Sequence, residues 1–339
     1  IQQLEQQRQL DYVDYTAVMQ LKLPVMTRLY HWFKDNAASE QALHDAFAAF
    51  KQQGGDSLYQ LALYDALHAH LYQQDPMHWG WPNWPECYRD ATSEQVVAFA
   101  EQHQAEIEFY CYLQFIAQQQ LAAAQQVAVD QGMLLGLYRD LAVGVSEAST
   151  EIWGNPELYC RDASVGAPPD PLGPAGQNWG LPPMYPYQLY KQGYRPFIDL
   201  LRANMASAGA LRIDHVMALL RLWWVPKAAE NAGGGAYVYY PVETLLAIVC
   251  LESQRARCVV IGEDLGLVPP DIIHRLYTSG IYSNELFYFC KDHQGFKPPS
   301  QYKFQSLMML ANHDVPTLVA WWTCSDLHLR RQLELFNTD

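Results

Sequence analysis

Residues 211–216 read Leu-Arg-Ile-Asp-His-Val, an apolar run that charged side chains interrupt. Alternate side chains of a strand point to the same face, so Arg212 and Asp214 are expected to lie together on a buried strand. A guanidinium beside a carboxyl group favours its ionised form. An ionised Asp at the end of an apolar strand is typical of a covalent nucleophile; a strand-end salt bridge is the competing interpretation.

Length and composition limit the kind of protein that surrounds this stretch. The 339 residues could form one large α/β barrel or two domains, and a hydrophobic content of 50% indicates a globular fold. A net charge of −14 argues against a nucleic-acid partner, because phosphate backbones attract basic surfaces. No apolar run is long enough to span a membrane, and residues 1–20 lack a signal-peptide pattern. We therefore expect no membrane partner and a cytoplasmic location.

The cysteine and histidine residues show no metal-binding pattern. The seven cysteines include no Cys-x-x-Cys pair and no zinc-like spacing, which predicts reduced, mostly buried thiols. His215 and His313 are interpreted as hydrogen-bond partners for hydroxyl groups rather than as metal ligands. We expect neither a metal nor another cofactor.

Residues 1–131 have helical periodicity and no recognisable chemistry, which predicts an all-helical subdomain. Gly54 and Gly55 are expected to end one helix, and Thr92 with Gln95 predicts the capping box of a long helix that reaches about residue 129. The tryptophans of residues 79–85 are expected to pack beneath an ordered loop rather than to stack on a sugar.

Residues 132–339 alternate between strand and helix patterns, which predicts βα units and a parallel sheet. Strands are expected at residues 133–145, 211–216, 258–261, 281–289 and 306–310. Three of them run into an acidic residue, namely Asp214, Glu263 and Asp314. In an α/β fold of the (β/α)8 TIM-barrel type, strand ends converge on the face where active sites lie. The pattern therefore predicts one site with three carboxylates, and three unrelated strand-end acids are the alternative.

Residues 166–186 form a Pro- and Gly-rich stretch without helical or strand periodicity. Long irregular loops in compact domains are usually functional. Asp170, Gln177 and Trp179 could present a carboxylate, an amide and an indole ring to a ligand, and flat aromatic rings suit the apolar faces of sugars. A purely structural loop is the other interpretation.

With these residues assembled, the chain resembles the amylomaltase (4-alpha-glucanotransferase) family, in particular its enterobacterial maltodextrin type. The matching motifs are L-R-I-D-H at 211–215, V-I-G-E-D-L at 260–265, H-D-V-P-T-L at 313–318 and G-A-P-P-D-x-L-G-P-x-G-Q-N-W-G at 166–180. Residues 140–153 are similar to a divergent form of the family's third-strand motif. The resemblance runs through essentially the whole chain and is weakest in residues 1–130.

The resemblance implies a retaining transfer between maltodextrins or starch-derived α-1,4-glucans. It implies that Asp214 is the nucleophile, Glu263 the general acid and base, and Asp314 the third acid, which binds hydroxyl groups of the donor sugar. Such a double displacement requires carboxyl groups about 5–5.5 Å apart. The residues that it implies for substrate binding are Arg212, His215, His313, Asp170, Gln177 and Trp179.

Counted against the family, residues 132–339 supply barrel strands three to seven, with residues 1–131 as a helical subdomain inserted in the barrel. Strands one, two and eight are not found, and the chain starts at Ile1 and stops near an expected helix over 326–336. We therefore expect a piece of a longer protein. Two other functions stay open: an α-amylase-like hydrolase with water as the acceptor, and a non-catalytic glucan-binding fragment. Incubation with maltotriose distinguishes a transferase, which makes longer products, from a hydrolase.

Overall fold

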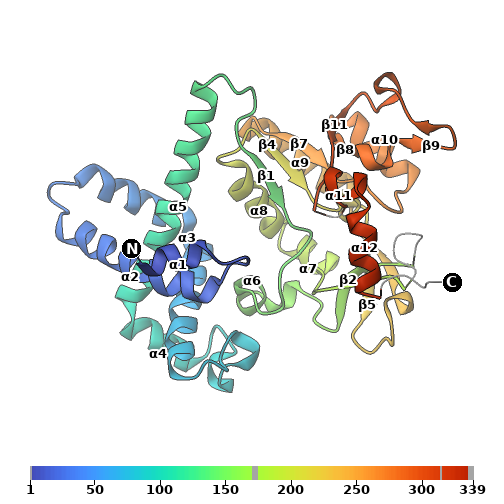
Figure 1. Ribbon diagram of the computed structural model, residues 1–339. Helices are drawn as coiled ribbons and strands as arrows, with labels where there is room; N and C mark the ends of the chain where they lie inside the picture. The colour runs from blue at the N-terminus through green and yellow to red at the C-terminus, as the bar shows by residue number, and fades with distance from the viewer. Residues whose placement is uncertain (1, 170–174, 314, 335–339) are drawn as a thin grey trace. The chain divides into compact units, whose positions relative to one another are not determined.

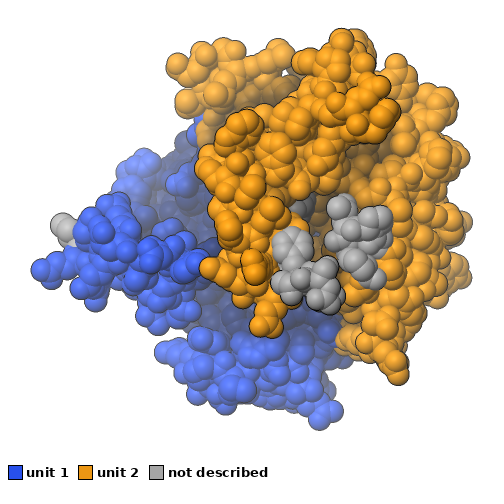
Figure 2. All heavy atoms as spheres, turned by 45° about the vertical axis from the view of Figure 1, so that its right-hand side comes forward, with its two compact units in different colours: residues 1–123, 146–156 blue, residues 124–145, 157–339 orange. Residues whose placement is uncertain are grey.

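The computed structural model describes residues 2–169, 175–313 and 315–334. The chain divides into two compact units (Figure 2): unit 1 holds residues 1–123 and 146–156, and unit 2 holds residues 124–145 and 157–339. This division falls before the predicted boundary at residue 131. Within unit 2, the Gln125 side chain donates to the Leu135 carbonyl at 3.0 Å and accepts from the Leu137 N–H at 2.6 Å.

The regular elements that the structure describes in unit 1 are helices (Figure 1). They are α1 (Gln2–Arg8), α2 (Tyr15–Asp35), α3 (Gln41–Gln74), α4 (Glu94–Gln102), the larger part of α5 (Gln104–Asp130), α6 (Thr150–Gly154) and the 3-10 turns η1 (Trp81–Asn83) and η2 (Glu86–Tyr88). The helix end predicted at Gly54 and Gly55 is a break inside α3, where Gly55 has φ 50° and ψ −141°.

The predicted cap at Thr92 is wrong by one residue. The Ser93 hydroxyl caps α4 by accepting the Val96 N–H at 3.2 Å. The Thr92 hydroxyl instead donates to the Asp90 carboxylate at 2.7 Å. Sequence spacing alone does not distinguish these neighbouring hydroxyl groups.

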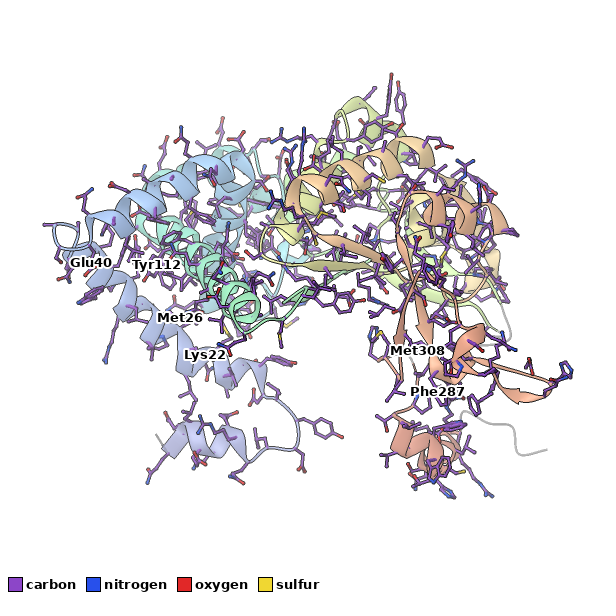
Figure 3. All side chains as sticks on the ribbon, turned by 90° about the horizontal axis from the view of Figure 1, so that it is seen from above. Lys22, Met26, Glu40, Tyr112, Phe287 and Met308 are labelled. Atoms are coloured by element: carbon purple, nitrogen blue, oxygen red, sulfur yellow. The ribbon has the colours of Figure 1, made fainter. Side chains whose placement is uncertain are left out.

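Aromatic side chains form much of the core of unit 1. Figure 3 labels Tyr112 on α5, and its ring lies 4.9 Å from that of Phe33 and 6.0 Å from that of Phe47. The prediction for the tryptophans of residues 79–85 is confirmed for Trp81 and Trp84, which are buried, whereas Trp79 is 55% exposed.

Unit 2 contains a five-stranded parallel sheet in the order β1-β4-β7-β8-β11, which confirms the predicted α/β class. The strands are β1 (Tyr138–Leu141), β4 (Ala210–Ile213), β7 (Val259–Gly262), β8 (Tyr282–Leu286) and β11 (Ser306–Met309). Between them in the chain lie the helices α8 (Arg195–Met205), α9 (Val242–Ala256) and α10 (Pro270–Thr278).

The strand predicted over residues 133–145 is shorter than expected. Only Tyr138–Leu141 pairs with β4, and Leu134 is 96% exposed. Pairing begins where the Leu137 carbonyl accepts the N–H groups of Gly209 and Ala210 at 3.1 and 3.2 Å. An apolar run therefore marks the neighbourhood of the strand but not its start.

A second, four-stranded antiparallel sheet in unit 2 corrects the prediction that residues 166–186 lack a strand. Its order is β3-β2-β5-β6, formed by β2 (Ala163–Ala167), β3 (Gln177–Leu181), β5 (Arg221–Pro226) and β6 (Ala236–Tyr239). A register shift between Val165 and Gly166 and the positive φ of Gly180 interrupt the alternation of side chains on which strand prediction depends. A Cβ on Gly166 would lie 2.0 Å from the Gln177 carbonyl oxygen, so only glycine permits this approach.

The remaining elements of unit 2 are short. They are α7 (Pro186–Lys191), β9 (Lys291–Asp292), β10 (Gly295–Phe296), α11 (Leu318–Trp322), α12 (Ser325–Gln332) and the 3-10 turns η3 (Pro156–Leu158), η4 (Val216–Leu219), η5 (Ala232–Gly234), η6 (Phe287–Phe289) and η7 (Pro299–Gln301). The helix predicted over residues 326–336 thus ends at Gln332. Among the described residues, no helix has both the length and the apolar character needed to cross a membrane.

The seven cysteines are free thiols, but the expectation that most are buried is too strong. Three are buried, two are partly exposed and two are exposed, the last being Cys87 and Cys324.

Candidate active site

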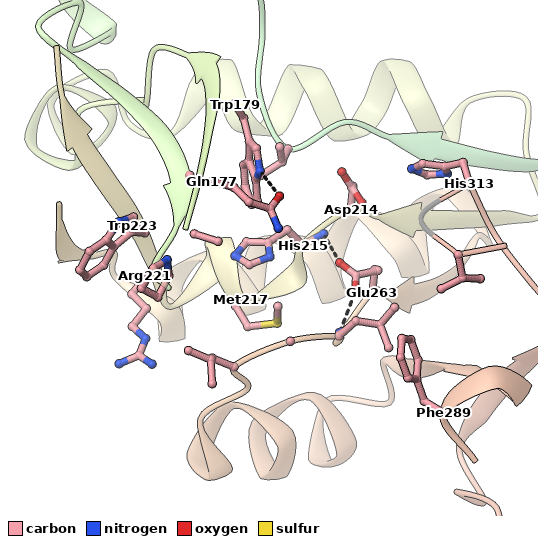
Figure 4. A pocket seen from close by; sticks show the side chains of 18 of the residues that line it. Gln177, Trp179, Asp214, His215, Met217, Arg221, Trp223, Glu263, Phe289 and His313 are labelled. Carbon is pink, nitrogen blue, oxygen red and sulfur yellow. Dashed lines mark hydrogen bonds between the residues drawn. The ribbon is translucent and has the colours of Figure 1, made fainter. Parts of the chain in front are cut away.

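A cavity of about 520 Å³ lies in unit 2 where β4 and β7 end (Figure 4). Its volume falls in the range of roughly 300–1,000 Å³ that is common for ligand sites. Residues that follow the parallel strands and residues of the antiparallel sheet both line it. They include Asp214, His215, Met217, Glu263, Leu265, Tyr288, Phe289, His313, Gln177, Trp179, Arg221, Trp223 and Tyr237.

Arg212 and Asp214 lie on the same side of the chain at the end of β4, as the sequence predicted. The buried Arg212 places Nη2 2.9 Å from Oδ1 of Asp214 and donates a hydrogen bond from Nη1 to Asp140 at 2.8 Å. The contact with Asp214 is an ion pair without hydrogen-bond geometry, since Nη2 has no hydrogen-bond partner. The guanidinium therefore puts a positive charge beside the expected nucleophile and is itself anchored by β1.

Glu263 directly follows β7 and is 7% exposed. Its carboxylate accepts the backbone N–H of His215 at 3.0 Å and that of Leu265 at 2.6 Å. Burial raises the pKa of Glu263 and the charge of Asp214 raises it further; against the opposing effect of these hydrogen bonds the value reaches about 7. Glu263 can therefore hold a proton near neutral pH, as a general acid must.

His215 has a left-handed backbone, with φ 48° and ψ 62°, which is uncommon for a residue other than glycine. The N–H of this residue is the one that donates to Glu263. Burial lowers the pKa of the imidazole to about 4, so the ring is neutral at neutral pH. The Trp179 ring meets it edge-on, with centroids 5.2 Å apart. A neutral imidazole in this position can donate to or accept from a sugar hydroxyl.

Gln177 and Trp179 reach the cavity from β3. The indole N–H of Trp179 donates to the side-chain oxygen of Gln177 at 2.9 Å, so the two side chains orient each other. His313 also lines the cavity (Figure 4). The expected site residues Asp170 and Asp314 lie outside the described residues. The structure thus brings seven expected side chains together, six on the cavity wall and Arg212 beside Asp214.

Sequence reasoning missed one wall of the cavity. Arg221 and Trp223 on β5 and Tyr237 on β6 line it, as do Tyr288 and Phe289 beyond β8. The only available signal was an aromatic run that is followed in the sequence by a Gly-rich loop at residues 233–235. This succession is typical of two antiparallel strands joined by a turn.

Within residues 2–169, 175–313 and 315–334, no group of three or more His, Cys, Asp or Glu side chains is arranged to hold a metal ion. The described part of the site offers carboxylates, an amide, imidazoles, a guanidinium and aromatic rings.

Comparison with known sequences shows the family to which the chain is similar. Residues 1–338 match the family model described as 4-alpha-glucanotransferase. The 4-alpha-glucanotransferase of Haemophilus influenzae is 41% identical over 335 residues, which are 97% of this chain and 48% of that protein. That of Mycobacterium bovis is 34% identical over 332 residues, which are 96% of this chain and 44% of that protein. The chain thus spans about half the length of these curated relatives.

Solved structures lead to the same conclusion. The amylomaltase of Corynebacterium glutamicum is 30% identical and superposes with a TM-score of 0.78 over 96% of this chain and 42% of that one. The amylomaltase of Streptococcus agalactiae, solved in complex with acarbose, is 19% identical and superposes with a TM-score of 0.78 over 96% of this chain and 66% of that one. At this identity, the similarity supports the fold alone. Since the family model covers residues 1–338, and the motifs predicted the same assignment, the chain belongs to the 4-alpha-glucanotransferase family.

Proposed function

We propose that this chain carries the catalytic centre of a 4-alpha-glucanotransferase, which transfers α-1,4-glucan segments between maltodextrins. The observation that carries the proposal is the pairing of Glu263, whose pKa burial raises to about 7, with Asp214 in one cavity. One carboxyl group retains a proton near neutral pH while a guanidinium accompanies the other. This difference between two neighbouring carboxyl groups is what acid catalysis with a covalent nucleophile requires.

In the first step, an Asp214 oxygen attacks the anomeric carbon of the donor and a C–O bond forms. The bond from that carbon to the leaving oxygen breaks, and Glu263 transfers its proton to that oxygen. In the second step, Glu263 takes the proton of the acceptor 4-hydroxyl, whose oxygen displaces Asp214 from the anomeric carbon. Two inversions retain the α configuration, and the proposal requires the two carboxyl groups to lie about 5–5.5 Å apart.

Other residues are proposed to bind the sugar at the bond that breaks. Arg212 and His313 would bind the glucosyl residue that becomes attached to Asp214. His215, Gln177 and Trp179 would contact this residue or its neighbour from the cavity wall. Asp314 is proposed as the third acid and Asp170 as a further binding residue, both from the motifs alone. The stretch 166–186 is proposed to exclude water, which would favour transfer over hydrolysis.

The parallel sheet is proposed to form strands three to seven of an eight-stranded barrel, with residues 1–131 as an inserted helical subdomain. The family relatives, which are about twice as long, have the length needed for the other strands. A parallel sheet is normally covered on both faces and has no open edges when closed into a barrel. A cytoplasmic location and maltodextrins as natural donors and acceptors belong to the same proposal.

Incubation of the complete gene product with maltotriose tests the proposed function. A transferase yields glucose together with a ladder of products longer than maltotriose. Formation of shorter products alone would identify a hydrolase, and binding without any product would identify a glucan-binding protein. The Glu263→Gln variant, prepared in parallel, distinguishes product formed by this site from product formed by a contaminating enzyme.

A further inference from the structure

The antiparallel sheet presents a group of flat side chains to the cavity at Arg221, Trp223 and Tyr237. Arg221 is paired in register with Tyr239, and Trp223 with Tyr237, so the four side chains share one face of β5 and β6. None of them belongs to the motifs that carry the carboxylates. The proposed mechanism gives this face no role.

Mutual contacts hold these side chains in fixed orientations. The Arg221 guanidinium carbon lies 3.7 Å from the centre of the Tyr237 ring, and Nη1 donates to the Tyr239 hydroxyl at 3.3 Å. The Trp223 ring meets the Tyr237 ring at 73°, with centroids 4.9 Å apart. The indole N–H of Trp223 donates to the Ala232 carbonyl at 2.8 Å. A ligand would therefore meet a preorganised surface and would order few side chains on binding.

This surface lies away from the expected point of bond cleavage. In Figure 4, His215 and Met217 lie between the carboxylates of Asp214 and Glu263 and the Arg221–Trp223 pair. All of these residues line the same cavity of about 520 Å³, which has room for more than one glucosyl residue. A chain held at the carboxylates could therefore extend towards the antiparallel sheet.

The chemistry of the surface suits a neutral sugar chain. Aromatic rings cover the apolar faces of pyranoses, and a guanidinium offers several N–H donors to hydroxyl groups. Among the described residues, Arg221 has no ion pair with a carboxylate, so its outer N–H groups are not held by an acidic side chain. On the basis of the proposed function, we propose that Arg221, Trp223 and Tyr237 form a remote glucosyl subsite that makes the site prefer longer maltodextrins.

Gly235 offers a way to disturb this subsite without deleting any of its side chains. A Cβ at Gly235 would lie 2.5 Å from Nε1 of Trp223 and 2.6 Å from the Trp224 carbonyl oxygen, so Gly235→Ala must displace the indole ring. At the adjacent Gly234 the nearest atom would be the Ala229 Cβ at 3.2 Å, which a small shift of the loop can accommodate. Gly234→Ala is therefore the matched control.

The decisive measurement is the ratio of kcat/KM for maltoheptaose to that for maltotriose in the complete gene product. The loss of one aromatic–sugar contact corresponds to roughly a tenfold change, so Trp223→Ala and Gly235→Ala should lower this ratio about tenfold. Gly234→Ala should keep the wild-type ratio, as should Trp79→Ala, which removes an exposed tryptophan from unit 1. An unchanged ratio in Trp223→Ala and Gly235→Ala would overturn the subsite.

Direct binding separates the subsite from the proposed function. Calorimetric titration of maltoheptaose and maltotriose into Glu263→Gln variants measures the length preference without turnover. If the wild-type protein forms no product, the proposed function is lost, yet a weaker preference for maltoheptaose in Trp223→Ala still supports the subsite. If Arg221→Met abolishes binding of glucose 1-phosphate but leaves the affinity for maltoheptaose unchanged, the surface is an anion site and the subsite is overturned.

Discussion

Two glutamates, one in each unit, are partly or fully buried, and their pKa values are shifted in opposite directions. Glu108 on α5 accepts hydrogen bonds from the Tyr30 hydroxyl at 2.9 Å, from Lys34 at 2.5 Å and from Lys51 at 2.6 Å. Burial raises the pKa of Glu108, but these donors outweigh it and bring the value to about 2. Glu263 is more deeply buried, and its pKa is about 7.

The difference shows how neighbouring groups determine whether a buried carboxyl group has a structural or a catalytic role. Two lysines hold Glu108 in its ionised form, which suits a permanent link between helices and cannot deliver a proton near neutral pH. The donors to Glu263 are backbone N–H groups, and the nearby guanidinium of Arg212 is already shared by Asp140 and Asp214. A buried acid beside a second acid is the arrangement that raises a pKa towards the working pH of an enzyme.

The largest expected effect concerns activity after the same substitution at the two glutamates. Glu263→Gln should lower the transferase rate by about 10²- to 10⁴-fold, because an amide cannot donate or accept the catalytic proton. Glu108→Gln should keep a rate close to that of the wild type. Initial rates of glucose release from maltotriose measure both variants. Equal losses of rate in the two variants would show that the difference in pKa between the two glutamates is unrelated to catalysis.

The pH dependence of activity should follow the raised pKa of Glu263. As pH rises through about 7, the folded protein loses the proton of this group. The kcat/KM for maltotriose should therefore fall roughly tenfold per pH unit above that value. The residual rate of Glu263→Gln should lack this decline. A wild-type rate that stays constant from pH 7 to pH 9 would contradict the assignment of Glu263 as the proton donor.

At alkaline pH, replacing Glu263 should stabilise the fold although it lowers the activity. The folded pKa of Glu263 is about 7 against an ordinary 4.5, so its contribution to stability is present below pH 4.5 and is lost as pH rises through 7. At pH 8, Glu263→Gln should therefore be more stable than the wild type by about 1–3 kcal/mol. Urea denaturation at pH 8 and pH 5 measures this, and a variant less stable at pH 8 would refute it.

The smallest effect is expected at Glu108. Its folded pKa of about 2 lies below the ordinary 4.5, so its contribution to stability is present above pH 4.5 and is lost as pH falls through 2. Because Lys34 and Lys51 are partly exposed and screened by solvent, Glu108→Gln should cost about 1–2 kcal/mol at pH 7. The difference between the urea midpoints of the variant and the wild type should be smaller at pH 3 than at pH 7. An equal loss of stability at pH 7 and pH 3 would mean that the substitution removes packing contacts rather than a charge interaction.

Much of unit 2 followed from local patterns. The strands that end before Asp214 and Glu263 and the contact between Arg212 and Asp214 were predicted, because side-chain alternation and strand–helix order are local properties. The antiparallel sheet was missed. β2 and β3 pair across a bulge, and glycines at Gly166 and Gly180 carry no side chain to extend a pattern.

The residues of the candidate site likewise include some that the sequence predicted and others that it did not. Gln177 and Trp179 could be expected because they stand in a recognisable stretch, and the structure brings both to the cavity. Arg221, Trp223 and Tyr237 stand in no motif, and they share a face only because β5 and β6 pair in one particular register. The hydrogen bond from Arg212 to Asp140 likewise depends on the pairing of β1 with β4, which joins residues 72 positions apart.

The amino-acid sequence by itself determined which acids stand at strand ends and that a guanidinium accompanies one of them, since both depend on neighbours along the chain. Only the tertiary structure decided which acid retains a proton. That outcome depends on burial, on the charge of Asp214 and on the N–H groups that His215 and Leu265 direct at Glu263. These energies depend on distance and solvent exposure, which residues acquire when separate strands are packed side by side.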